Sequence, residues 1–414
     1  MKDPALHSKE KTFGVVHGPV REDLLREETL ADLFRKSSKT FSKKTALRFQ
    51  EKECTYEELD RWSDLIAAEL TRVGVKRGQA VGLWWPRSLE LHAAVLGIAK
   101  SGAAYVPMDT EMPLERVKVV MKEVGAAACF CPDRQNDFPC AILSIPQAPK
   151  FSIKKNASLP EGPKPDDRAY VLFTSGSTGL PKGVPISHRQ ICHLIRAEQT
   201  VLKIDSDDRV YQGFSVSFDM WCEETWISFF AGATVVVADA LTAKAVDELP
   251  DFLNREKISV LHAVPSLLGV MENAVPSLRL INAGGEALSP AVARRWAKPG
   301  RMILNSYGPT ETTVTATMNL VDPDEPIAIG SPLPNYSLAV VDESLSTVPV
   351  GVEGELVIAG PGLSEGYLNR KELTAQKFPE KPAALSALPG MRIYRTGDAA
   401  LLSEDGKIFF RGRL

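Results

Sequence analysis

The chain has 414 residues, of which 49 are Lys or Arg and 52 are Asp or Glu, so its formal net charge is −3. Hydrophobic residues make up 44% and charged residues 24% of the sequence, which excludes a disordered chain. The balanced charge also gives no basic excess of the kind that binds nucleic acid or an anionic membrane surface. At a typical ~100–200 residues per domain, the length predicts about two or three packed units.

The cysteines argue for a reducing compartment. There are six, with no Cys-x-x-Cys pair: Cys54, Cys129, Cys131, Cys140, Cys192 and Cys222. Cys129, Cys131 and Cys140 are conceivable metal ligands, but their apolar setting favours a buried strand. No apolar run approaches the ~20 residues of a bilayer span, and residues 1–12 lack the apolar core of a signal peptide. We therefore expect a cytoplasmic protein.

The pattern of apolar residues changes twice along the chain. Residues 1–45 are charged, apart from one helical stretch at 28–38 that should pack on the core. Between 46 and about 326, short apolar runs alternate with helical patterns. The predicted strands of this part are 80–85, 170–173, 234–238, 258–263, 278–282 and 302–304. This alternation predicts an α/β fold with a mostly parallel sheet, in which ligands bind beyond the carboxyl ends of the strands.

The remaining part, 327–414, is richer in Gly and Pro and has alternating strand patterns at 355–358 and 407–410. It is predicted to form a smaller β-rich unit. The stretch 150–167, rich in Pro, Lys and Asp, is predicted to be a solvated connector.

The strongest local motif is Tyr-Val-Leu-Phe-Thr-Ser-Gly-Ser-Thr-Gly-Leu-Pro-Lys-Gly-Val at 170–184. A buried strand leads into a loop in which Gly176 and Gly179 permit a tight backbone. The loop residues that can donate to phosphate oxygens are Thr174, Ser175, Ser177, Thr178 and Lys182. The loop does not match G-x-x-x-x-G-K-[ST], because Gly183 follows the lysine. Taken alone, it is also compatible with a flexible surface turn.

This loop resembles the signature of adenylate-forming enzymes, and other segments resemble further motifs of that family in the same order. These segments are 55–59, 100–109, 218–220, 305–313, 354–356, 394–398 and 412–413. The resemblance runs from about residue 28 to the last residue. It is greater to the adenylation domains of nonribosomal peptide synthetases than to luciferases or acyl-CoA ligases.

The resemblance implies a fold and a two-step reaction. The fold is the family's large N-terminal core, with parallel α/β sheets packed together and a smaller β-rich subdomain. In the first step a carboxylate attacks the α-phosphorus of ATP bound with Mg²⁺, which gives an acyl-adenylate and pyrophosphate. In the second step the acyl group passes to the phosphopantetheine thiol of a carrier domain outside this chain. The implied partners are an amino acid, as the small-molecule substrate, and that carrier domain, and we expect the chain to be a monomer.

The resemblance also assigns roles to individual residues. Thr174, Lys182 and Glu311 are the expected catalytic residues, with Glu311 as the Mg²⁺ ligand. Asn305 is expected to hydrogen-bond adenine, Tyr307 to stack on it, Asp398 to accept from the ribose hydroxyls, and Arg413 to lie near the ribose and hinge. The remaining residues of the expected nucleotide site are Ser175, Gly176, Ser177, Thr178, Gly179, Gly284 and Thr310. The alternatives are a core position for Tyr307, a turn for Asp398 and a solvated helix for Glu311.

Two histidines need separate interpretation. His188 follows the phosphate loop, but a carboxylate substrate is already ionised at neutral pH, so no general base is required. We therefore expect His188 to pack or to gate the site. His262 occupies a pocket position of the family and is interpreted either as a pocket residue or as a core histidine.

The family's hinge residue and small C-terminal subdomain, which carries a lysine that stabilises the transition state, are expected after Arg413 and do not occur within the 414 residues. Because one preorganised electrostatic donor is worth roughly 10²–10³ in kcat, we expect binding of nucleotide and amino acid with weak adenylation. An enzyme that works without this subdomain and a non-catalytic nucleotide-binding module are the alternatives.

Asp219 occupies the family position that binds the α-ammonium group of an amino acid. The other expected pocket residues are Met220, Glu223, His262, Ile281, Ala283, Ser306, Val314 and Thr315. Glu224 is expected to be structural. Glu223 lies either in the pocket or with Glu224 on a surface helix.

An inward-facing Glu223 favours a cationic side chain. An opposite charge at ~4 Å is worth about 4 kcal/mol at an effective dielectric constant near 20. Together with Asp219 it predicts a diamino acid such as ornithine or lysine, and this segment resembles that of synthetases that polymerise a basic amino acid. The alternative substrate is a quaternary ammonium acid such as betaine, held by Met220, Trp221 and Trp226.

Overall fold

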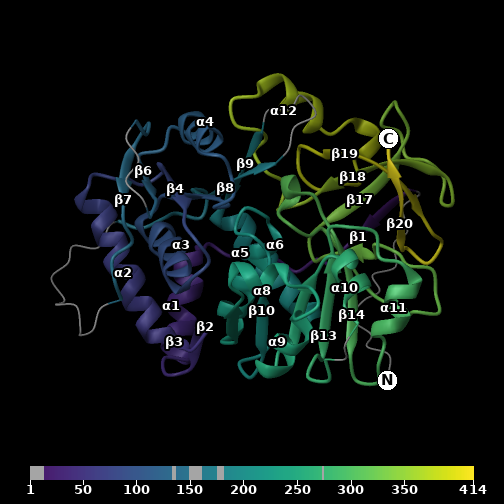
Figure 1. Ribbon diagram of the computed structural model, residues 1–414. Helices are drawn as coiled ribbons and strands as arrows, with labels where there is room; N and C mark the ends of the chain where they lie inside the picture. The colour runs from purple at the N-terminus through teal and green to yellow at the C-terminus, as the bar shows by residue number, and fades with distance from the viewer. Residues whose placement is uncertain (1–13, 133–136, 149–160, 175–180, 273–274) are drawn as a thin grey trace.

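The computed structural model describes residues 14–132, 137–148, 161–174, 181–272 and 275–414. Within these ranges the strands form three sheets that lie side by side (Figure 1), with helices packed on two of them. The predicted α/β class is confirmed. No helix in the described part of the chain has both the length and the apolarity to cross a bilayer.

The six-stranded sheet is parallel except at one edge. Its order is β7 (Ala141–Leu143), β6 (Ala128–Phe130), β4 (Ala80–Trp84), β5 (Ala104–Met108), β8 (Arg168–Thr174) and β9 (Lys182–Ser187), and only β8–β9 is antiparallel. The helices of this part are α2 (Tyr56–Arg72), α3 (Leu89–Ser101) and α4 (Leu114–Val124). Cys129 is buried in β6, as the strand interpretation predicts. The described residues contain no metal-binding group of three His, Cys, Asp or Glu.

The nine-stranded sheet has a parallel centre and antiparallel edges. Its order is β16 (Ser331–Pro332), β15 (Thr317–Leu320), β14 (Met302–Tyr307), β13 (Leu280–Gly284), β12 (Val260–Ala263), β10 (Arg209–Gln212), β11 (Thr234–Val237), β2 (Thr45–Phe49) and β3 (Lys52–Thr55).

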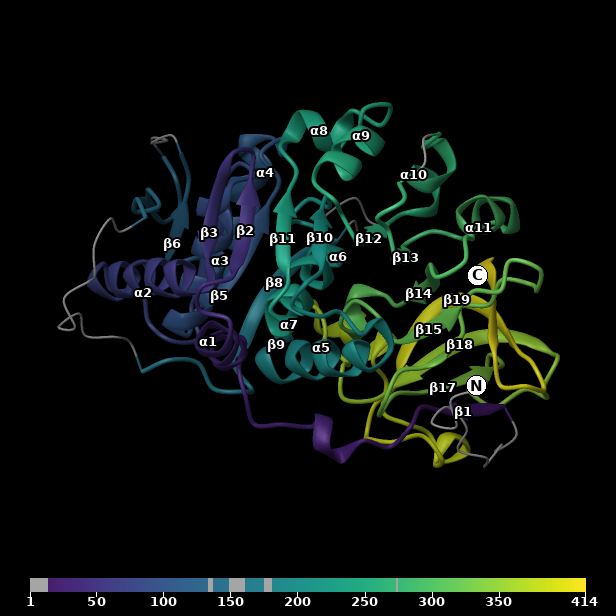
Figure 2. The same ribbon diagram turned by 90° about the horizontal axis from the view of Figure 1, so that it is seen from below.

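Helices cover both faces of this sheet. On one face lie α8 (Ala240–Lys244), α9 (Leu249–Arg255), α10 (Pro265–Val270) and α11 (Pro290–Trp296); on the other lie α5 (His188–Leu202) and α7 (Ser228–Ala231), as Figure 2 shows. The two faces therefore offer different surroundings to alternate residues of the same strand.

The five-stranded sheet is antiparallel and joins the two ends of the chain. Its order is β1 (Val15–His17), β17 (Ser337–Val341), β18 (Glu353–Ala359), β19 (Tyr394–Leu402) and β20 (Ile408–Arg413), and α12 (Lys371–Lys377) belongs to the same part. The sequence pattern did not predict β1. After it the chain passes through η2 (Glu22–Leu24) to α1 (Leu30–Thr40), which the predicted stretch 28–38 anticipates (Figure 2). A short 3₁₀ turn, η5 (Ala383–Leu385), lies between α12 and β19.

The close approach of α2 and α3 depends on one glycine. A methyl group added at Gly97 would lie 2.6 Å from Cβ of Ile66 on α2, well inside van der Waals contact. Both helices are buried at this contact, so the Ile66 side chain cannot move into solvent to make room for the methyl group.

We therefore expect Gly97→Ala to lower the free energy of unfolding by about 1–3 kcal/mol, because the packed helices must separate to admit the methyl group. Gly269→Ala in α10 is the matched control. Its methyl group would meet the nearest atom, Cγ2 of Val292, at 3.8 Å, and the exchange should be neutral or stabilising. Urea unfolding measures both; an unchanged midpoint for Gly97→Ala would contradict this account of the helix contact.

Candidate active site

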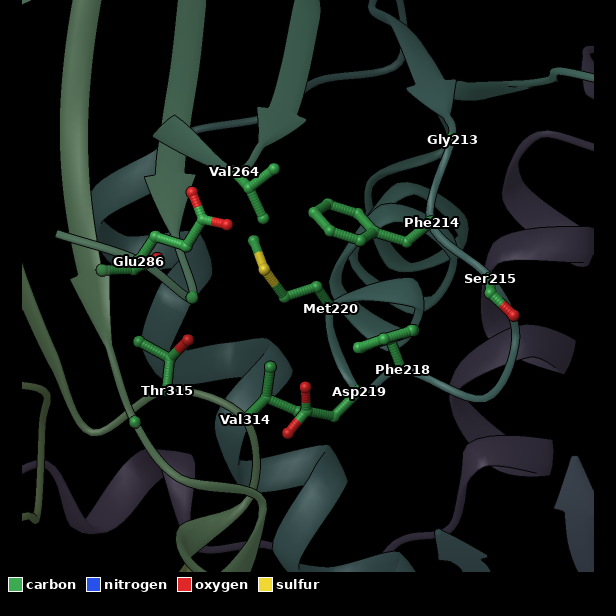
Figure 3. A pocket seen from close by; sticks show the side chains of 13 residues that line it. Gly213, Phe214, Ser215, Phe218, Asp219, Met220, Val264, Glu286, Val314 and Thr315 are labelled. Carbon is green, nitrogen blue, oxygen red and sulfur yellow. The ribbon is translucent and has the colours of Figure 1, made fainter. Parts of the chain in front are cut away.

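A cavity of about 430 Å³ lies beyond the carboxyl ends of the central parallel strands, where an α/β sheet is expected to bind its ligand. The residues that line it lie at or after the ends of β10, β12, β13 and β14, or belong to the segments 218–220 and 314–315. They are Gly213, Phe214, Ser215, Phe218, Asp219, Met220, Val264, Gly285, Glu286, Ser306, Gly308, Val314 and Thr315. Figure 3 shows the Met220 side chain among them, between Val264 and Val314. Five predicted substrate residues thus meet here: Asp219, Met220, Ser306, Val314 and Thr315.

Asp219 is half-buried at the edge of this cavity (Figure 3). Its Oδ2 accepts a hydrogen bond of 2.6 Å from Oγ1 of Thr310, the first residue of the 3₁₀ turn η4 (Thr310–Thr312). Burial, together with the negative charges of Glu223 and Glu311, raises the pKa of Asp219 to about 6, although the Thr310 hydrogen bond acts the other way. The carboxyl group is therefore held in place without a positively charged protein partner among the described residues, and an ammonium group would supply one.

A strained turn presents Val314 and Thr315 to the cavity. Thr313 and Val314 have φ angles of 64° and 61°, a left-handed conformation that a β-branched residue adopts only under constraint. The constraint is visible at Thr313, whose buried hydroxyl donates to the carbonyl of Gly362 at 2.6 Å.

The next functional segment is helical and contains a π-turn. It runs through α6 (Met220–Cys222), the π-helical η3 (Glu223–Ile227) and α7, and such turns often mark functional sites. Glu224 accepts from the Gln212 side chain at 2.8 Å and from the Gly213 backbone at 2.9 Å, so it ties the segment to the loop after β10. It has the structural role that the sequence predicts.

Glu223 points into the protein, because its side chain is only 1% exposed. Its Oε1 accepts from Oγ1 of Thr315 at 2.5 Å, while Nδ2 of Asn282 and Nδ1 of His262 each lie 3.3 Å from Oε2. Burial alone would raise the pKa of Glu223, but His262 and the other hydrogen-bonding partners lower it below its usual value. The surface alternative for Glu223 is wrong. His262 lies beneath the cavity wall rather than on it.

Two predicted pocket residues, Ile281 and Ala283, do not line the cavity. They face the apolar cluster under α9, α10 and α11, which also contains Leu261 of the neighbouring strand. Alternate strand residues point to opposite faces, so Asn282 between them faces Glu223 together with its strand partner His262. Asn282, which the sequence did not indicate, therefore faces Glu223 in place of the expected pair, although it does not line the cavity either.

The nucleotide half of the site begins where β8 ends at Thr174 and β9 begins at Lys182, two residues that pair in register. Nζ of Lys182 lies 2.7 Å from Oε1 of Glu311 and 3.1 Å from the hydroxyl of Tyr367, which itself donates to Oε1 at 2.7 Å. Tyr367 was not predicted. Within the described residues the buried Thr174 hydroxyl has no hydrogen-bond partner. The predicted Ser175, Gly176, Ser177, Thr178 and Gly179 lie outside the described residues.

Glu311 is buried, contrary to the solvated alternative. Its burial would raise its pKa, but the ammonium group of Lys182 outweighs burial and lowers it, so the carboxylate is ionised. The hydrogen bonds from Lys182 and Tyr367 both go to Oε1. A single carboxylate suits Mg²⁺, which commonly takes one or two carboxylates and completes its shell with phosphate oxygens and water.

The expected adenosine residues converge at the junction with the five-stranded sheet. The hydroxyl of Tyr307 donates to Oδ2 of Asp398 at 2.5 Å, and Nε of Arg413 lies 3.1 Å from Oδ1. Burial raises the pKa of Asp398, although the Tyr307 hydrogen bond opposes this. Asn305 shares the Tyr307 face of β14, and its amide donates to the carbonyl of Ala328 at 2.8 Å. Asp398 lies in β19 and not in a turn.

Two further predicted residues have packing roles. A methyl group at Gly284 would lie 2.5 Å from Oγ of Ser306, so a larger residue there would displace the Ser306 hydroxyl that lies at the cavity. His188 is fully buried, its Nδ1 accepts from the backbone of Leu30 at 3.2 Å, and burial lowers its pKa to about 4. This neutral, engaged ring supports packing for His188.

The raised pKa of Asp219 predicts a stability cost with a defined pH dependence. Its pKa rises from 3.8 to about 6 on folding. The folded chain is therefore most stable below pH ~4, where the carboxyl group is protonated in both states, and it loses stability as the pH rises through 6 and the buried group has to ionise. We expect Asp219→Asn to be more stable than the parent chain at pH 7.5 by about 1–2 kcal/mol, a value reduced from the full shift because the cavity admits solvent. This gain should disappear near pH 4.

Asp208→Asn is the control of opposite sign. Burial would raise the pKa of Asp208, but hydrogen bonds from Arg279 and Ser259 lower it. This variant should lose stability at pH 7.5 and keep most of that loss near pH 4, because a pKa lowered below 3.8 ends its contribution only at more acidic pH. Thermal unfolding of both variants at the two pH values measures the difference; parallel behaviour would contradict the assignment for Asp219.

Comparison with known proteins identifies the family. The model of the AMP-binding enzyme family matches residues 34–368. The delta-poly-L-ornithine synthetase of Acinetobacter baumannii (strain AB307-0294) is 40% identical over 407 residues, which are 97% of this chain and 30% of that protein. The chain thus spans less than a third of this relative's length.

Solved structures agree with the sequence comparison. The nonribosomal peptide synthetase FmoA3 superposes with a TM-score of 0.85 at 29% identity, over 96% of this chain and 43% of that chain. The N-terminal subdomain of Klebsiella oxytoca NpsA, in complex with 3-hydroxyanthranilyl-AMSN, has a TM-score of 0.80 at 27% identity and is covered over its whole length, together with 93% of this chain. The chain belongs to the family of AMP-binding enzymes and has the fold of a nonribosomal peptide synthetase adenylation core.

Proposed function

We propose that this chain binds ATP and an amino acid and joins them as an aminoacyl-adenylate, as the core of an amino acid adenylating ligase. One observation carries the proposal. Two successive residues of the η4 turn reach in different directions: Thr310 holds Asp219 at the cavity, and Glu311 holds Lys182 at the end of the phosphate loop. A substrate whose α-ammonium pairs with Asp219 therefore brings its carboxylate toward the group that would hold the phosphates.

The proposed chemistry needs charge placement and no protein base. A carboxylate oxygen of the amino acid forms a bond to the α-phosphorus of ATP, the bond from that phosphorus to the β-bridging oxygen breaks, and pyrophosphate leaves. Lys182 and the Thr174 hydroxyl, which has no hydrogen-bond partner among the described residues, would contact the phosphates, where positive charge and donors stabilise the transition state. Mg²⁺ on Glu311 would neutralise phosphate charge. The carboxylate is already ionised, so His188 has no proton to remove.

The second step would need a carrier domain that is not part of this chain. A phosphopantetheine thiol of a carrier domain replaces AMP on the acyl group, so a thioester forms as the mixed anhydride breaks. The carrier domain lies outside this chain and is part of the proposal.

We further propose a diamino acid as the substrate. Glu223 is an ionised carboxylate in a dry position, and its partner Thr315 lines the cavity. A neutral substrate side chain would leave this charge without a cation, whereas ornithine or lysine would supply one. The name of the polyornithine synthetase relative agrees with this assignment. No observation supports betaine as the substrate, because Trp221 and Trp226 are buried in the core and do not line the cavity.

We expect Glu311→Gln to remove the gain in ATP affinity that Mg²⁺ provides, because a neutral amide is a poor ligand for a hard cation. Calorimetric titrations of ATP with and without Mg²⁺ should show a gain of about tenfold or more for the parent chain and almost none for the variant. Without Mg²⁺ the variant should bind ATP at least as well, because Lys182 is released from its ion pair. Glu256→Gln, whose ion pairs with Arg48 and Arg209 lie at the opposite end of the sheet, should behave like the parent. An undiminished Mg²⁺ effect in Glu311→Gln would contradict the role of Glu311.

We expect ornithine or lysine to bind at least about 30-fold more tightly than norvaline, which lacks the distal amine, since half of the ~4 kcal/mol of a close charge pair gives this ratio. Glu223→Gln should abolish the preference. Asp219→Asn is the matched control, because it should weaken all α-amino acids alike. Calorimetry with these amino acids and betaine decides: tighter binding of betaine or norvaline would contradict the diamino acid, and ATP binding with no amino acid binding would favour a nucleotide-binding module.

A further inference from the structure

A second buried carboxyl group, which the sequence analysis did not single out, lies beside Glu223. Glu198 belongs to α5, which packs against the η3 turn, and its side chain is 0% exposed. Glu223 and Thr315 are its close polar neighbours. Neither carboxyl oxygen of Glu198 meets the geometry of a hydrogen bond to any described residue.

Other polar atoms of this group also lack partners in the part of the chain that the structure describes. They are Oδ1 of Asn282 and Nε2 of His262, both fully or almost fully buried. Buried polar atoms without partners are costly and rare, so several in one place require an explanation. Most of them are acceptors, and an ammonium group, with three donors and no acceptor, is the side-chain cation that complements them.

Among the described residues no lysine or arginine faces the two carboxyl groups; their basic neighbour is His262, whose Nδ1 lies 3.3 Å from Oε2 of Glu223. The groups that face Glu198 are Glu223 from η3, Thr315 from the turn before β15 and Tyr336 from the segment before β17, with His262 of β12 beyond Glu223. Two carboxylates side by side in a dry interior do not both ionise. Burial and the charge of Glu223 raise the pKa of Glu198 far above its usual value, so the pair holds one proton in the free chain.

We propose that Glu198 is a further specificity-determining residue, which forms with Glu223 the receptor for the distal ammonium of the substrate, and that this ammonium replaces the proton that the two carboxyl groups hold. The inference rests on the proposed function. Thr315 lines the cavity and donates to Glu223, so this residue links the cavity to the pair of carboxyl groups. The proton leaves an oxygen of Glu198 for the solvent, and no bond of the substrate changes.

Calorimetry of the full chain at pH 7 in two buffers of different ionisation enthalpy tests this directly, because the enthalpy difference reports the protons released on binding. We expect ornithine to release nearly one proton more than norvaline. Norvaline is the control for any proton that Asp219 releases, because Asp219 would pair with the α-ammonium of both ligands. Equal proton release would overturn the inference, and this measurement needs no variant.

Glu198→Gln provides the second measurement. It should remove the extra proton release and weaken ornithine about tenfold or more, since it deletes a charged hydrogen-bond partner, while norvaline binding stays unchanged. Thermal unfolding checks that the variant is folded.

The two proposals can fail separately. If ornithine binds better than norvaline and only Glu223→Gln removes this preference, then the role of Glu198 is overturned and the proposed function stands. If ornithine does not bind, or binds no better than norvaline in the parent chain, the diamino acid substrate and the role of Glu198 are both overturned, whereas adenylation of another amino acid is not.

Discussion

The site depends on one turn of backbone, the 3₁₀ turn Thr310–Thr312, which couples two carboxylates with different tasks. Through Thr310 it orients Asp219 at the cavity, and through Glu311 it fixes Lys182 at the phosphate loop. Because the residues are adjacent, the separation between the amino acid and nucleotide halves is set by covalent geometry. Hydrogen-bonded positioning of this kind lets two reactants meet without further reorganisation, which accounts for a large part of the rate of such reactions.

The surroundings of this turn carry a cost in stability that the rest of the fold must offset. Val314 is held in a left-handed conformation, and Asp219, Glu223 and Glu198 keep carboxyl groups in poorly solvated positions. Each of these features costs about 1–3 kcal/mol. The broad parallel sheet and its two helical layers supply the buried apolar area that tolerates them. In the proposed complex a ligand with two ammonium groups would pair with Asp219 through one of them and with Glu223 and Glu198 through the other.

Much of the fold was predictable because its signal is local. The apolar runs at 80–85, 170–173 and 302–304 form β4, β8 and β14, because a strand buried on both faces needs continuous apolar residues. The same applies to Lys182, Glu311 and Asp219, which lie in recognisable motifs. Tyr367 and β1 were not predicted, because their roles come from pairing with segments far away in the chain: Glu311 for the first and β17 for the second.

The sequence alone determined the α/β class and the family, and it predicted the phosphate-binding segment and the α-ammonium partner. Only the tertiary structure decided that Glu223 faces inward, that Asn282 replaces Ile281 and Ala283 beside it, and that Glu198 joins them. The reason is physical. A glutamate on a helix looks the same in the sequence whether its side chain faces solvent or a buried pocket. Alternation along a strand shows that neighbouring residues face opposite ways, but it does not show which face of the sheet binds the ligand. That choice is made when α5 and η3 pack on one face of the sheet and α8–α11 on the other.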